Sequence, residues 1–165
     1  MVNDFSAGES RGVGSRQCKR KAFEPCAYEN SHACRDKVTR MKNFLAIQHV
    51  SVIVADTERA LVFYRDVLGL TVDPRRPDLG YPGAWLMIGA QQIHLLELPN
   101  PDPVADRPAH GGRDRHCALT LRDLDGLRQR LDAAGISYTS SKSGRRALFC
   151  RDPDNNALEF IEVPA

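Results

Sequence analysis

Four residues with metal-binding side chains lie in four separate apolar segments of the chain. They are His49 in IQHVSVIV, His94 in QQIHLLEL, His116 in RHCALTL and Glu159 in NALEFIEV. Each segment alternates in the manner of a β-strand, so a polar side chain can point into an otherwise apolar interior. Burying several polar groups costs about 1 to 3 kcal/mol each unless a partner satisfies them. The pattern therefore favours a bound divalent cation over the alternative of unrelated core histidines and a surface glutamate.

The spacing of these four residues repeats along the chain. His49 and His116 are 67 positions apart, and His94 and Glu159 are 65 positions apart. Two similar halves would thus each supply one ligand from their first strand and one from their last. Three imidazoles and one carboxylate suit one divalent transition metal (Ni, Co, Zn, Fe or Mn) and disfavour Ca²⁺ and Mg²⁺, which prefer oxygen ligands. Such an ion can polarise a carbonyl, stabilise an enediolate or activate a water.

The first half, residues 46–98, has the pattern strand, helix and three strands. Asp56 is the expected N-cap of the helix, apolar residues follow at helical spacing, and Gly69 is expected to end it. The strands of this half are predicted at 47–54, 70–72, 84–88 and 92–98.

The second half, residues 115–163, repeats this order. Asp123 is the expected helix N-cap and Gly135 the expected stop. A Pro/Gly-rich linker, residues 99–114, separates the halves and is long enough to let one half pair with a second chain. The strands of this half are predicted at 115–121, 136–139, 147–150 and 157–163.

The length and composition predict one folded domain over residues 44–165. At 165 residues and 42% hydrophobic content, the chain can bury one substantial core. Residues 1–43 lack a helical or strand period and are expected to be a disordered or non-native extension. Met41, six residues before the first predicted strand, is a candidate for the true initiator.

The charge distribution argues against binding to nucleic acid or to a membrane. The net charge is +2, but residues 1–43 hold nine Lys/Arg against five Asp/Glu, which leaves 14 against 16 for the rest. The folded part therefore has no basic footprint. No apolar stretch reaches the roughly 18 to 20 residues of a membrane helix, and the N-terminus lacks the apolar h-region typical of a secretory signal, so a cytoplasmic location is expected.

The same segments resemble a known superfamily. HVSVIVAD followed by FYRDVLGL, together with DPDNNALE near the end, is similar to the vicinal oxygen chelate group of glyoxalase I, fosfomycin-resistance proteins, bleomycin-binding proteins and extradiol dioxygenases. The resemblance covers nearly all of residues 46–163. It implies an α+β fold in which paired βαβββ modules form a half-open mixed β-barrel around a metal site.

The resemblance also implies the ligands and the assembly. His49, His94, His116 and Glu159 fall on the four ligand positions, although glyoxalase I usually has Glu or Gln where His94 stands. Members commonly form homodimers whose barrels are shared between chains. In that case His49 and His94 of one subunit would meet His116 and Glu159 of the other; a barrel within one chain is the alternative.

Glyoxalase I is the member that the ligand set resembles most closely. The expected function is that of a metal-dependent lyase or isomerase, similar to lactoylglutathione lyase, acting on a small substrate, including a thiol adduct, chelated through vicinal oxygens. Glu159 would move the substrate proton. Arginines near the ligands would bind a substrate carboxylate, unless they are solvated surface groups, and two aromatics would line the mouth or pack in the core. These candidates are Arg113, Arg115, Arg145, Arg146, Tyr81 and Trp85.

Three other functions remain open. A thiol transferase of the fosfomycin-resistance type is disfavoured. Ala147 and Phe149 stand at the positions where the resemblance to that family implies a Ser and a Tyr. An extradiol-type dioxygenase needs two His, one carboxylate and open positions, one of which His94 would block. A non-catalytic small-molecule-binding protein is disfavoured by the complete ligand set.

Overall fold

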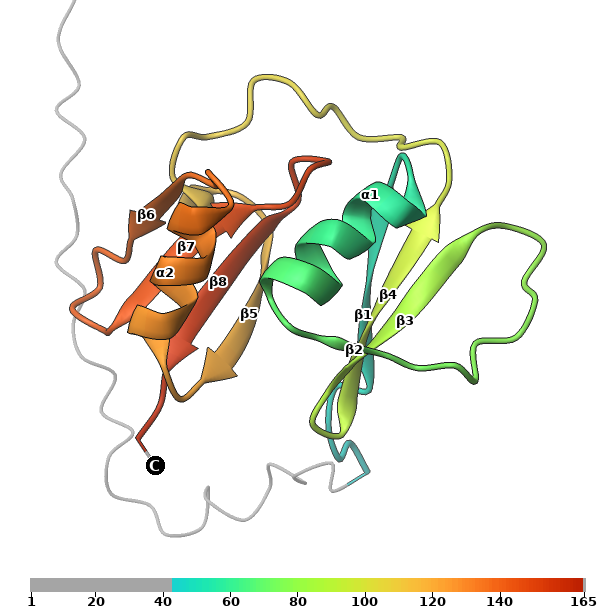
Figure 1. The fold of residues 1–165 in the computed structure, drawn as a ribbon, viewed down its shortest axis with the longest axis horizontal. Coiled ribbons are helices and arrows are strands. Elements are labelled where there is room, and N and C mark those ends of the chain that lie inside the picture. The colour runs from blue at the N-terminus through green and yellow to red at the C-terminus, as the bar shows by residue number, and fades with distance from the viewer. Residues whose placement is uncertain (1–42, 165) are drawn as a thin grey trace, which may run out of the picture. The chain divides into compact units, whose positions relative to one another are not determined.

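The structure is a computed structural model that describes residues 43–164 (Figure 1). The predictions for residues 1–43 fall, except for Asn43, outside the described residues. The first module consists of β1 (His49–Val54), α1 (Thr57–Leu61), the π-helical segment η1 (Val62–Val67), β2 (Thr71–Val72), β3 (Gly83–Ile88) and β4 (Gln91–Glu97). A 3₁₀ turn, η2 (Gly111–Arg113), lies in the connection, and the second module consists of β5 (His116–Leu121), α2 (Leu124–Ala133), β6 (Tyr138–Ser140), β7 (Ala147–Arg151) and β8 (Ala157–Glu162).

Each module builds one four-stranded mixed sheet. The strand order is β1-β4-β3-β2 in the first sheet and β5-β8-β7-β6 in the second. In both, the first and last strands of the module run parallel and the remaining pairs are antiparallel. The predicted α+β class with paired βαβββ modules is confirmed. Among the described strands the two sheets share no hydrogen-bonded pair, so they do not close into a complete barrel.

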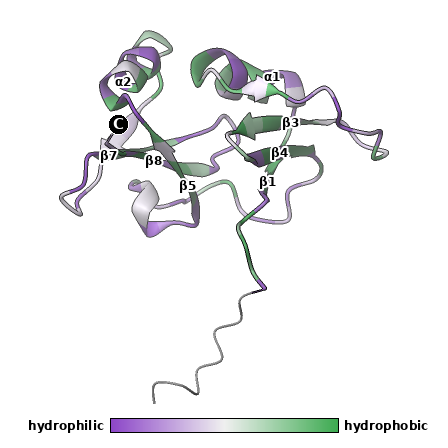
Figure 2. Ribbon diagram, turned by 90° about the horizontal axis from the view of Figure 1, so that it is seen from below, coloured by the Kyte–Doolittle hydropathy of each residue, from purple (hydrophilic) through white to green (hydrophobic). Residues whose placement is uncertain are grey.

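The expected ends of both helices are present. Asp56 accepts a hydrogen bond from the backbone of the first turn of α1, and Asp123 does the same for α2. Gly69 and Gly135 adopt φ values of 78° and 67°, the left-handed conformation in which glycine ends a helix without strain. Figure 2 shows each helix over one face of its own sheet. No described helix has the length and apolar composition needed to span a membrane.

The last strand of each module also holds the start of the module's helix. Glu97, at the end of β4, accepts a hydrogen bond from the backbone N–H of Thr57 at 2.8 Å. Glu162, at the end of β8, accepts one from Leu124 at 3.0 Å. A carboxylate at a helix N-terminus satisfies a free N–H group and interacts favourably with the helix dipole. The two modules are therefore repeats in their contacts as well as in their strand order.

The first helix differs from the prediction in its second half, where it becomes π-helical from Val62 onward. The wider turn accommodates two consecutive buried aromatics, Phe63 and Tyr64, whose rings meet edge to face at 4.9 Å. The predicted strand at 136–139 begins two residues later, as β6.

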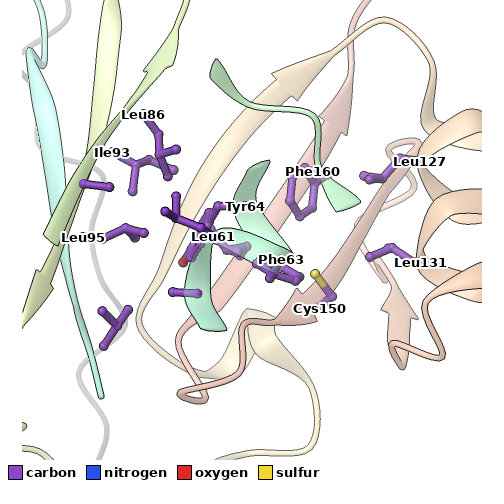
Figure 3. Close-up of a cluster of buried hydrophobic side chains, with 14 of the residues drawn as sticks. Leu61, Phe63, Tyr64, Leu86, Ile93, Leu95, Leu127, Leu131, Cys150 and Phe160 are labelled. Carbon is purple, nitrogen blue, oxygen red and sulfur yellow. The ribbon is translucent and has the colours of Figure 1, made fainter. Parts of the chain in front are cut away.

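One apolar core joins the two modules. Leu61, Phe63 and Tyr64 lie beside side chains of the second module, among them Cys150 and Phe160 (Figure 3). Tyr64 is completely buried, and its hydroxyl donates to Asp152 Oδ2 at 2.9 Å. Since the helices occupy the core side of the sheets, the opposite face of each sheet carries the predicted ligands.

Candidate metal centre

The strand register places the two predicted ligand pairs in equivalent positions. His49 lies opposite Gln92 in the parallel pair of β1 and β4, and His94 follows two residues further along β4. His116 lies opposite Ala157 in the parallel pair of β5 and β8, and Glu159 follows two residues further along β8. Residues two apart on a strand share a face. Each module therefore presents one ligand pair on one face of its sheet, which explains the repeated spacing of the sequence.

The first pair is a stack of aromatic rings. The ring centroids of His49 and His94 are 4.1 Å apart and their planes differ by 9°. Trp85 covers the other face of His94, with centroids 4.6 Å apart and an interplanar angle of 12°. Burial, followed by the charges of His49 and Arg76, lowers the pKa of His94. These effects favour the neutral form of the His94 ring, the form in which an imidazole binds a metal.

The second pair brings a nitrogen and an oxygen to ligand spacing. His116 Nε2 lies 3.3 Å from Glu159 Oε2, and Glu159 is only 4% exposed. Two ligands that bind one ion at about 2.1 Å and about 90 to 105° lie about 3.0 to 3.3 Å apart. His116 Nδ1 contacts the carbonyl oxygen of Asp114 at 2.8 Å. The proton of a neutral ring is therefore on Nδ1, and the Nε2 lone pair faces a carboxylate oxygen, an arrangement that needs a proton or a metal ion.

The loop before β5 is braced around Asp114. Its carboxylate accepts hydrogen bonds from Arg151 at 2.9 Å and from Arg107 at 3.1 Å. Burial alone would raise the pKa of Asp114, but these contacts lower it. The carbonyl that orients His116 is therefore fixed by an ionised, doubly paired side chain.

Within a single chain the four predicted ligands lie as two separate pairs. Among residues 43–164, no three His, Cys, Asp or Glu side chains lie close enough together to hold one ion. The donor set fits a divalent transition metal, since three imidazoles and a carboxylate are present and the second pair already has ligand spacing. The first pair has to turn one ring, because stacked parallel rings cannot direct in-plane lone pairs at the same point.

Comparison with known proteins identifies the fold family. Residues 46–160 match the family described as Glyoxalase/Bleomycin resistance protein/Dioxygenase superfamily. The chain belongs to this superfamily. The family predicted from the sequence is thereby confirmed.

The names of relatives within the superfamily state several different activities. The chain is 31% identical over 121 residues to Glyoxylase I 4 of Arabidopsis thaliana, which covers 70% of this chain and 69% of that protein. It is 28% identical over 118 residues to the glutathione transferase FosA of Serratia marcescens, covering 70% and 79%. The crystal structure of a lactoylglutathione lyase from Agrobacterium tumefaciens aligns with a TM-score of 0.53 and 27% identity over 73% of this chain and 96% of that chain.

Two of the four predicted arginines border a cavity beside the second ligand pair. This cavity of about 400 Å³ is lined by His116, Glu159, Arg113 and Arg145. Arg145 donates to Glu159 Oε1 at 3.4 Å, and its side chain is 58% exposed. Because Lys142 also lines it, the cavity combines a buried carboxylate with three cationic groups, as the binding of an anionic substrate requires.

The other two arginines form ion pairs elsewhere on this superfamily member. Arg115 pairs with Asp102 at 2.7 Å and lines a second cavity of about 360 Å³, which His116 also borders. Arg146 pairs with Glu162 and, at 2.9 Å, with Asp125. The structure does not bring these two side chains to the cavity beside Glu159.

The two predicted aromatics differ in their placement. Trp85 lies in the site, stacked on His94. Tyr81 lies in the loop before β3, where the Arg76 guanidinium covers its ring at 5.4 Å and donates to its carbonyl oxygen at 2.7 Å. Tyr81 is therefore a loop contact, and only Trp85 touches a predicted ligand.

Sequence reasoning missed His110, which also lines the cavity beside Glu159. Its Nδ1 accepts a hydrogen bond from the backbone of Gly112 at 3.0 Å, and its ring lies 4.9 Å from that of Phe149. A Cβ added at Gly111 or Gly112 would lie 3.1 Å from Phe149 atoms. The paired glycines after a histidine were the available signal, because they mark a close approach of the backbone to a ring.

Proposed function

We propose that this chain is a metal-dependent lyase or isomerase similar to glyoxalase I, acting on a small anionic substrate that presents two neighbouring oxygens. The main support is the pairing of His116 with the buried Glu159 beside a cavity that also contains Arg113 and Arg145. The relatives named glyoxylase I and lactoylglutathione lyase support the reaction class. A thiol adduct with a free carboxylate is the substrate type that such a cavity suits.

The metal would be held by His49, His94, His116 and Glu159. Because each module keeps its own pair, we propose that a homodimer completes the set, with His49 and His94 of one subunit facing His116 and Glu159 of the partner subunit. A bound Ni²⁺, Co²⁺, Zn²⁺, Fe²⁺ or Mn²⁺ would polarise the substrate oxygens as a Lewis acid.

The side chains of the chain itself supply the remaining chemistry. Glu159 moves the substrate proton, since it is the one carboxylate of the set and its burial excludes bulk water. Arg113 and Arg145 bind the anionic group of the substrate. Phe149 packs edge to face on His116 at 5.3 Å and keeps that ring in place.

A thiol transferase is the second candidate, supported by the similarity to a glutathione transferase. It is the weaker candidate, because Ala147 and Phe149 bring no hydroxyl groups to the positions discussed above. Oxygen-dependent ring cleavage and simple ligand binding are the outcomes left if both transfer and isomerisation are absent.

Metal analysis of purified protein, followed by assay with methylglyoxal and glutathione, tests the proposal. We expect divalent metal to co-purify and product to form. Glu159→Gln should lower the rate by about 10² to 10⁴-fold, while the exposed Glu58→Gln should leave it unchanged. A stable wild-type protein that takes up no divalent metal would reject the mechanism; glutathione addition to an epoxide, or oxygen uptake with a catechol, would reassign the reaction.

A further inference from the structure

The ring of His94 has a fixed plane but two ways to lie in it. Trp85 and His49 stack on its two faces. A half turn about the Cβ–Cγ bond keeps the plane and exchanges Nε2 with Cε1, so stacking alone does not choose between the two orientations. The contact that chooses is between His94 Nε2 and Gln92 Oε1, at 2.9 Å.

The orientation of the Gln92 amide is itself fixed by its neighbours. Its Nε2 donates to Asp73 Oδ2 at 2.9 Å and contacts Met87 Sδ at 3.3 Å, and both of these atoms are acceptors. Arg75 donates to both oxygens of Asp73, each at 2.8 Å. Its hydrogen bonds lower the pKa of Asp73 to about 2, so the carboxylate is ionised at neutral pH and only accepts. The oxygen of the Gln92 amide must therefore face His94.

We propose that Asp73 and Gln92 are positioning residues that hold neutral His94 as its Nε2–H tautomer, so that Nδ1 is the nitrogen it offers to the ion. An amide oxygen only accepts, and the ring nitrogen facing it must donate. This role rests on the proposed metal centre. His116 is held in the opposite tautomer by the carbonyl of Asp114 and offers Nε2. Partners of this kind set the tautomer and basicity of metal-binding histidines.

Long-range ¹H–¹⁵N NMR of the metal-free protein reads the tautomer directly. We expect His94 to show a protonated Nε2 and an unprotonated Nδ1. Gln92→Met removes the acceptor, and Asp73→Asn removes the constraint on the amide while keeping Gln92; both should give mixed tautomer signals. Gln91→Met, at an exposed position of the same strand, is the matched control and should resemble the wild type. An unprotonated Nε2 in the wild type, or unchanged signals in both variants, would overturn the assignment.

Titration with Co²⁺, followed by its visible absorption, tests the consequence for binding. Gln92→Met should weaken Co²⁺ affinity about 10 to 100-fold, the usual effect of losing such a partner, with Gln91→Met unchanged. Equal affinity of Gln92→Met and wild type would overturn the positioning role. If the wild type takes up no Co²⁺ while His94 keeps its Nε2–H signal, the metal centre is rejected and the tautomer assignment stands.

Discussion

Glu97 accepts a hydrogen bond from the N–H of Thr57, forty residues earlier, and so ties the end of β4 to the start of α1. Glu162 and Leu124 repeat this relationship in the second module. The offsets, 65 between the glutamates and 67 between the helix starts, equal those between the predicted metal ligands. Helix anchoring and ligand placement are thus parts of one repeated unit.

Removing either anchor should destabilise the protein. Glu97→Ala and Glu162→Ala each leave a helix N–H without its acceptor, and each should lower the free energy of unfolding by about 1 kcal/mol in urea titrations followed by circular dichroism. Glu58→Ala, in the first turn of α1, loses only a favourable interaction with the helix dipole and should cost a few tenths of a kcal/mol. Equal effects at Glu58 and Glu97 would contradict the anchoring role.

Asp73 should make stability fall in acid. Its folded-state pKa is lowered from 3.8 to about 2, chiefly by hydrogen bonds from Arg75. Because this pKa is lowered on folding, the stability that ionised Asp73 contributes is fully present above about pH 4 and is lost as the pH falls through about 2. Arg75→Met should therefore lose less stability than wild type over this window, measured as the unfolding temperature against pH. Parallel curves for the two proteins would refute the assignment.

Crowding at Gly112 gives a third prediction. An added Cβ would lie 3.1 Å from both Phe149 Cζ and His110 Cε1. Gly112→Ala should lower the free energy of unfolding by about 1 to 3 kcal/mol, the usual cost of overpacking. Phe149→Leu replaces the obstructing ring with a shorter side chain. The double variant should therefore lose less free energy of unfolding than the sum of the two single changes. Simple additivity in this double-mutant cycle would show that the ring is not the obstacle.

Mixing two inactive variants tests the shared metal centre. His49→Ala and His116→Ala should each lose bound metal. If each centre takes one pair from each subunit, a heterodimer of the two variants has one intact centre and one centre lacking both histidines. Metal content and turnover should therefore reappear after the variants are unfolded and refolded together.

Refolding each variant alone is the control and should restore nothing. Heterodimers that form but remain metal-free would show that each centre belongs to one chain.

Local chemistry explains what the sequence predicted well. Asp56 and Asp123 cap helices through residues three positions away, so short spacing was enough to place them. The alternation of apolar residues likewise separated His49 and His94 each from the apolar neighbours on its own strand, because strand geometry repeats every two residues, and strand pairing puts the two on one face. The parallel register of β1 and β4 then confirms that shared face.

Sequence patterns of this kind could not predict the side-chain contacts between segments that are distant along the chain. Asp73 reaches Gln92 only because β2, β3 and β4 pair, and no periodicity marks that contact. Arg146 was grouped with Arg145 by sequence adjacency, yet in the bend before β7 the two side chains have different partners. Its partner is Glu162, sixteen residues away. The sheet face on which a strand residue lies is thus predictable from its spacing in the sequence, whereas its side-chain partner depends on the folded arrangement.

Trp85 is the single tryptophan of the chain, and it lies in contact with His94. All indole emission therefore arises at one edge of the candidate centre. The protein carries its own optical reporter: paramagnetic Co²⁺ or Ni²⁺ arriving at His94 would quench that emission, and the loading of the site can be followed without any label.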